Sequence, residues 1–174
     1  FPAPAAAALA VGATPVAADV DPETWNVAPD AVRAALGPRT RAIVAVDQLG
    51  FPADYPALEE LAGEVPIIED AACSLGASLG GRPCGSFGRL ATLSFHPRKV
   101  VTTGEGGAVL TDDPGLADRV RALRDHGRLN GEFVTAGLNL RLGEMASALG
   151  RCQLGRLDEL LAARSSLAAR HHEL

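Results

Sequence analysis

The sequence has few aromatic residues and little positive charge. Aromatic side chains make up 4% of its 174 residues, with one Trp and one Tyr, which is too few for the stacking platforms that bind single-stranded nucleic acid. The formal net charge is −5, so the chain offers no basic face to the phosphates of DNA or RNA. We therefore expect no nucleic-acid partner.

Cysteines and long apolar runs are also scarce. Cys73, Cys84 and Cys152 show neither CxxC spacing nor an even count. The sequence thus supports neither a disulfide framework nor a zinc site, and it favours a reducing, cytoplasmic setting. No segment is apolar enough to span a bilayer, so we expect no membrane partner. The uncharged stretch 1–18 lacks an initiating Met and the basic residues of a secretory signal, and we interpret it as the interior of a chain.

Lysine is the scarcest charged residue. Lys99 is the only lysine, beside 15 arginines. Arginine can replace lysine as a surface cation, but its guanidinium cannot act as an amine nucleophile. Lys99 is therefore a candidate catalytic residue, with an ordinary surface role as the alternative.

Short apolar stretches alternate with helical patterns along the chain, which predicts an α/β fold with a largely parallel sheet. We expect strands over 15–19, 41–46, 65–69, 91–95 and 108–111. We expect helices over 29–36, 54–62 with Asp54 as its N-cap, 114–124, and one long helix from 142 to the end.

Polar residues follow two of these strands. Glu69 and Asp70 end one strand, where open α/β sheets bind ligands, and strand alternation lets only one of them face such a site. The alternative is that Asp70 caps the next segment. Ser94 ends another strand five residues before Lys99, ahead of the glycine-rich stretch 104–107. This arrangement suits a phosphate beside a carbonyl-reactive amine, although the glycines alone also fit a tight turn.

Segments from nearly the whole chain together resemble the DegT/DnrJ/EryC1/StrS family of pyridoxal-phosphate-dependent sugar aminotransferases. The matching segments include EDAA (69–72), GSFG (85–88), SFHPRK (94–99), GEGG (104–107), RDHG (124–127) and GLNLRL (137–142). The resemblance implies a three-layer α/β large domain of fold type I with a mostly parallel sheet, truncated at both ends. Residues 1–142 would be part of that cofactor-binding domain, and 143–174 a long helix leading toward a small C-terminal domain.

The resemblance also implies roles for single residues. Lys99 matches the lysine that binds pyridoxal 5′-phosphate covalently and then moves a proton between substrate and cofactor. Asp70 matches the carboxylate that keeps the pyridine nitrogen protonated, and Ser94 matches a phosphate-binding hydroxyl. Asn139 matches an amide that reaches the phosphate held by a neighbouring subunit, which implies a homodimer with shared active sites. Cys73 stands where many members have Gln or His, and it is expected to pack against the cofactor.

The activity that the resemblance implies is transfer of an amino group from an amino acid, Glu or Gln, to a nucleotide-linked keto sugar. The family's N-terminal phosphate loop and its small C-terminal domain have no counterpart in residues 1–174, so we expect these residues alone to be inactive and poorly soluble. Two alternatives stay open. One is a non-catalytic remnant of the fold. The other is a dehydratase-type relative that works without the covalent lysine, against which Lys99 argues because a His is expected there.

Overall fold

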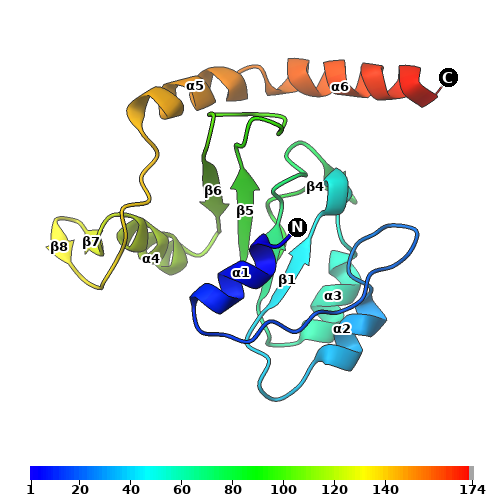
Figure 1. Cartoon of the computed structure of the whole chain (residues 1–174), viewed down its shortest axis with the longest axis horizontal. Helices are drawn as coiled ribbons and strands as arrows, with labels where there is room; N and C mark the ends of the chain where they lie inside the picture. The colour runs from blue at the N-terminus through cyan, green and yellow to red at the C-terminus, as the bar shows by residue number, and fades with distance from the viewer. Residues whose placement is uncertain (173–174) are drawn as a thin grey trace. The chain divides into compact units, whose positions relative to one another are not determined.

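The computed structural model describes residues 1–172. The chain divides into two compact units, Phe1–Thr92 and Leu93–Leu174 (Figure 1). They are called unit 1 and unit 2 below. The assignment of 1–142 and 143–174 to different domains stays a prediction, and residues 173–174 of the expected terminal helix lie outside the described residues.

Parallel strands form the centre of unit 1, as predicted. Strand β2 (Ile67–Asp70) lies between β1 (Ile43–Val46) and the first residues of β5 (Leu90–Ser94). Both pairings are parallel, with Asp70 in register with Val46 on one side and with Thr92 on the other. Asp70 is thus the last residue of the middle strand, at the carboxyl end of the sheet.

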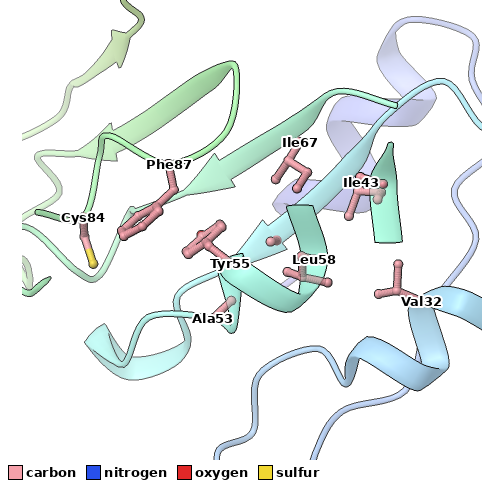
Figure 2. Close-up of a cluster of buried hydrophobic side chains, with 10 residues drawn as sticks. Val32, Ile43, Ala53, Tyr55, Leu58, Ile67, Cys84 and Phe87 are labelled. Carbon is pink, nitrogen blue, oxygen red and sulfur yellow. The ribbon is translucent and has the colours of Figure 1, made fainter. Parts of the chain in front are cut away.

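Two helices pack against these strands. They are α2 (Pro29–Ala35) and α3 (Tyr55–Ala62), and Asp54 caps α3 as predicted, accepting a hydrogen bond from the Ala57 N–H at 3.2 Å. Figure 2 shows their side chains meeting those of β1 and β2. The core cluster consists of Val32, Ile43, Ala45, Ala53, Tyr55, Leu58, Ala62, Ile67, Cys84 and Phe87. The Tyr55 and Phe87 rings stack with centroids 4.4 Å apart.

The first residues of unit 1 differ from expectation. Helix α1 (Ala3–Ala10) forms where no element was predicted, and none of its residues is buried. The strand predicted over 15–19 is wrong: these residues form no strand, and an isolated bridge joins the next residue, Val20, to Val27. Unit 1 also contains the short 3-10 helix η1 (Gln48–Gly50) and a hairpin of β3 (Ser78–Leu79) and β4 (Arg82–Pro83).

Unit 2 begins with the end of β5 and the strand β6 (Gly107–Leu110), whose arrows point in opposite directions (Figure 1). Helix α4 (Pro114–Arg124) has the predicted bounds. It is followed by a hairpin of β7 (Arg128–Leu129) and β8 (Glu132–Phe133). The hydrogen bond from the Phe95 N–H to the Gly106 carbonyl, 2.9 Å long, closes the turn between β5 and β6.

The long terminal helix expected from the sequence is divided in two. Helix α5 (Glu144–Leu154) ends at Gly155, and α6 (Leu157–His172) begins two residues later. Glycine is a poor residue for a helix interior, and the Arg156 guanidinium pairs with Glu159 in the first turn of α6 at 2.8 Å, which favours a new start. Searched for membrane spans, the described part of the chain yields no helix with the length and apolarity to cross a bilayer.

Candidate active site

Asp70 and Cys73 lie on one turn of unit 1, directly after β2. The half-buried Asp70 accepts a hydrogen bond from the Ala72 N–H at 3.1 Å, so it does cap the following segment locally. The Ser74 N–H donates to the Ala71 carbonyl at 3.1 Å, which closes the turn. Cys73 is exposed. The turn therefore presents a carboxylate and a thiol at the carboxyl end of the middle strand.

Ser94 and Lys99 lie on one strand-to-loop segment of unit 2. Ser94 is the last residue of β5, and its hydroxyl accepts a long hydrogen bond, 3.4 Å, from the His96 N–H. The Lys99 N–H donates to the His96 carbonyl at 2.9 Å, and the His96 Nδ1 accepts from the Arg98 N–H at 3.2 Å. His96 thus shapes the turn that carries the lysine.

The two terminal helices hold the loop around Lys99. From α6, the Arg164 guanidinium donates to the Lys99 carbonyl at 3.2 Å. From α5, the Gln153 side-chain oxygen accepts from the Thr102 N–H at 3.4 Å. The Thr102 hydroxyl in turn donates to the Phe95 carbonyl at 3.0 Å. Helices from the end of the chain therefore fix the backbone of the candidate catalytic loop.

Asn139 lies on a separate crossing of two segments in unit 2. It forms an isolated antiparallel bridge with Asp125, and its side chain is exposed. The crossing needs two glycines: a Cβ on Gly127 would lie 1.7 Å from the Thr135 carbonyl oxygen, and one on Gly137 would lie 2.2 Å from the Gly127 nitrogen. This close approach explains the glycines of the RDHG and GLNLRL segments.

Two arginines hold the same crossing through Asp125. Its carboxylate pairs with Arg128 at 3.1 Å and also with Arg141. Hydrogen bonds from Arg128 first, and then from Arg141, hold the pKa of Asp125 below its usual range. A charged carboxylate therefore fastens the segment that presents Asn139.

The predicted site residues thus fall into three places: the Asp70–Cys73 turn, the Ser94–Lys99 segment, and the Asn139 crossing. Sequence reasoning missed a fourth feature. Asp47 follows β1 as Asp70 ends β2, and it is fully buried beside the equally buried Glu69. The available signal in the sequence was a polar residue directly after an apolar strand. In the structure, the Asp47 N–H also donates to the Asp70 carbonyl at 3.1 Å.

Parallel strands with polar side chains at their carboxyl ends define the class of α/β proteins that bind ligands at that edge of the sheet. The model of the DegT/DnrJ/EryC1/StrS aminotransferase family matches residues 1–174, and the chain belongs to this family.

Solved structures agree with this assignment. DesV from S. venezuelae, solved in complex with a ketimine intermediate, is 43% identical with a TM-score of 0.91, covering 97% of this chain and 47% of DesV. DesI, solved in the presence of its TDP-sugar product, is also 43% identical with a TM-score of 0.85, covering 91% of this chain and 41% of DesI. The PLP-form of Spr1654 from Streptococcus pneumoniae is 26% identical with a TM-score of 0.91, covering 99% of this chain and 51% of that one. The chain thus spans about half the length of these proteins or less.

Proposed function

We propose that this chain carries cofactor-binding residues of a pyridoxal-phosphate-dependent aminotransferase, which transfers an amino group from Glu or Gln to a nucleotide-linked keto sugar. Family membership supports the reaction class. The TDP-sugar product of DesI supports the class of acceptor, and the PLP-form and PMP-form of Spr1654 support the cofactor. The observation that carries the proposal is the position of the only lysine, on the loop directly after β5.

The chemistry of the candidate residues fits this cofactor. Pyridoxal phosphate, when bound, supplies an aldehyde that reacts with amines and a ring that accepts electrons. The Asp70 carboxylate would hold the proton on the pyridine nitrogen, and the weakly engaged Ser94 hydroxyl would donate to the phosphate. The Lys99 amine would bind the aldehyde carbon and later move a proton at the substrate's α-carbon. Cys73, exposed on the Asp70 turn, would pack against the ring.

A homodimer with shared sites is part of the same proposal. The Asn139 amide is exposed, and large apolar side chains around it in the sequence are exposed too, with Phe133 at 76% and Met145 at 90%. Leu138 and Leu140 on either side of Asn139 add to this apolar surface. A second copy that covered these side chains would bring Asn139 toward its own cofactor phosphate. We also place the protein in the cytoplasm, because its three cysteines, all among the described residues, form no disulfide.

Lys99 distinguishes this function from its rivals. A dehydratase-type relative would carry a His at this position, and a remnant of the fold would have no need to keep the amine. In the full natural chain, Lys99→Arg should abolish the borohydride-trapped cofactor adduct while leaving the circular dichroism spectrum unchanged, because charge is kept and nucleophilicity is lost.

The matched control is Arg98→Lys, which adds an exposed amine one residue away. Peptide mass spectrometry after reduction should then still locate the adduct on Lys99. An adduct on another residue, or normal amino transfer by Lys99→Arg, would show that Lys99 does not bind the cofactor.

A further inference from the structure

Two buried carboxylates face each other beneath the Asp70 turn. Asp47 and Glu69 are each 0% exposed. A carboxylate oxygen of each and the Cys84 sulfur all lie within 4.8 Å of one another. Strand alternation sends Glu69 into unit 1, on the opposite face of β2 from Asp70. The cluster therefore lies inside the unit that carries the ring-binding candidate.

Asp47 joins the end of β1 to the start of α3 and to the turn 70–74. Its Oδ1 accepts from the Ala53 N–H at 3.1 Å and from the Tyr55 hydroxyl at 2.8 Å. Its Oδ2 accepts from the Ser74 hydroxyl at 2.6 Å. Its N–H donates to the Asp70 carbonyl at 3.1 Å. One residue thus binds both ends of the turn 70–74, through its main chain at the start and its side chain at the end.

Glu69 binds the loop after β4. Its Oε1 accepts from the Gly85 N–H at 2.6 Å, and its Oε2 accepts from the Phe87 N–H at 2.7 Å. Together with the donors to Asp47, these four oxygens take hydrogen bonds from neutral groups of the described residues: N–H groups, hydroxyls and the Cys84 thiol. Each oxygen already accepts a hydrogen bond, which argues against a metal ion bound by the same atoms.

Two carboxylates this close, out of water and with neutral donors only, cannot both ionise at modest cost. Burial raises the pKa of Glu69, the Gly85 and Phe87 N–H groups partly oppose this shift, and the neighbouring Asp47 raises the pKa further. The other titratable groups that face the pair are Tyr55 and Cys84, whose pKa values burial also raises. These groups stay neutral, so they do not compensate a second negative charge.

We propose that Asp47 is a positioning residue for the Asp70 turn, which it holds through Ser74, and that the Asp47–Glu69 pair keeps one shared proton while doing so. The assignment of Asp70 to the cofactor in this statement depends on the proposed function. The clamp on the turn and the shared proton do not, because both are properties of unit 1 without any ligand.

Two variants of the full natural chain separate the clamp from the proton. Ser74→Ala removes the hydroxyl that links the turn to Asp47, and Ser78→Ala on β3 is its matched control, since Ser78 is exposed. Asp47→Asn keeps a partner for Ser74, because a serine hydroxyl both donates and accepts, but it removes the second acid. Hydrogen exchange at the Ala72 amide and the carboxyl carbon resonance of Glu69 are then measured by NMR without cofactor.

Ser74→Ala should lower the protection of the Ala72 amide about tenfold, the effect of losing one hydrogen bond to a charged group. The same variant should leave the midpoint of the Glu69 titration raised. Asp47→Asn should do the reverse: protection of the Ala72 amide is kept, and the midpoint of the Glu69 titration falls, although burial should still hold it above that of an exposed Glu. Cofactor affinity, measured separately, should fall about tenfold in Ser74→Ala and stay unchanged in Ser78→Ala.

The proposal is overturned if Ser74→Ala and Ser78→Ala protect Ala72 equally, or if wild-type Glu69 titrates like an exposed Glu. If instead the ligand-free results are as expected and the wild-type chain binds no pyridoxal phosphate, the proposed function fails while the clamp and the shared proton stand. The two failures are therefore distinguishable.

Discussion

Units 1 and 2 differ in where their apolar side chains lie. The core cluster belongs entirely to unit 1 and joins two helices to two strands (Figure 2). In the described part of unit 2, only Phe95, Val101 and Ala122 are buried apolar side chains, and α6 buries no residue. Unit 1 is thus stabilised by its own interior, whereas unit 2 leaves apolar surface for something else to cover.

Both units carry exposed ion pairs, but among the described residues the fully buried acids belong to unit 1. The acids inside unit 1 are desolvated and take neutral hydrogen-bond donors. The ion pairs of unit 2 lie at the surface, as in Arg121 with Asp118 and Arg156 with Glu159. Buried acids respond to pH because burial changes their proton affinity, whereas surface pairs are weak and screened by salt. We therefore expect unit 1 to respond to pH and unit 2 to respond mainly to ionic strength.

The largest expected effect tests whether unit 1 takes part in amino transfer through Asp70. Asp70→Asn should slow amino transfer from glutamate by about three orders of magnitude, because a neutral pyridine ring stabilises the carbanion poorly. The fold should be kept, since an Asn side chain can still accept from the Ala72 N–H. The measurement is the single-turnover rate followed by cofactor absorbance in the full natural chain.

Asp54→Asn is the matched control for this change, because Asp54 likewise accepts a backbone N–H near the start of a new segment. Its rate should stay at the wild-type level. Equal rates for the two variants would assign Asp70 to local capping alone.

The next effect sharpens the contrast in packing. Leu58 on α3 is 0% exposed, whereas Leu167 on α6 is 54% exposed. Leu58→Ala should lower the free energy of unfolding by about 3 to 4 kcal/mol, since it removes buried methyl groups and leaves a cavity. Leu167→Ala should cost less than about 0.5 kcal/mol. Denaturant titration measures both, and similar losses would contradict the division between a packed and an exposed unit.

Much of unit 1 could be predicted because its signals are local. The apolar runs before Asp47 and Asp70 gave the parallel strands, and Asp54 marked the start of α3. In unit 2, Pro114 marked the start of α4. The strand predicted over 15–19 failed because apolar residues alone do not supply a pairing partner. Helix α1 was not predicted, although a Pro in the first turn of a helix is favourable.

The site could be predicted only in part, for a related reason. Lys99 stood out by composition, and Asp70 and Ser94 by their places at strand ends. The partnership of Asp47 with Glu69 depends on which strands become neighbours, and the two acids are 22 positions apart in the sequence. Strand order is a property of the whole sheet, so no local pattern reveals such a pair.

A third prediction uses the pH dependence of unit 1. Because the pKa of Glu69 is raised from 4.5 to about 7, the folded chain binds a proton more tightly than the unfolded chain between these values. Stability should therefore fall as pH rises from about 4.5 to about 7, by about 3 kcal/mol, and change little from this cause above or below that range.

Glu69→Gln should remove most of this slope. The variant should also be less stable at every pH, because an amide has one acceptor oxygen for the two N–H donors of Gly85 and Phe87. The comparison is therefore between slopes of unfolding free energy against pH and not between absolute stabilities. A variant with the wild-type slope would show that another group is responsible.

The smallest expected effect concerns the surface charges of unit 2. Asp125→Asn removes the charge that pairs with Arg128 and Arg141 at the Asn139 crossing. Its depressed pKa means that the charged form stabilises the folded state above the usual pKa of an Asp, and that this contribution is lost as pH falls through the lower folded value. The variant should therefore differ from wild type at neutral pH and converge with it in acid. Because Arg128 and Arg141 are exposed, salt should shrink the difference in unfolding free energy. This difference should stay well below the loss caused by Leu58→Ala.

Glu132→Gln, an exposed change on β8 in the same unit, is the control for Asp125→Asn. A loss for Asp125→Asn that persisted in high salt would mean that this carboxylate acts as a buried group does, and that unit 2, like unit 1, depends on a desolvated acid.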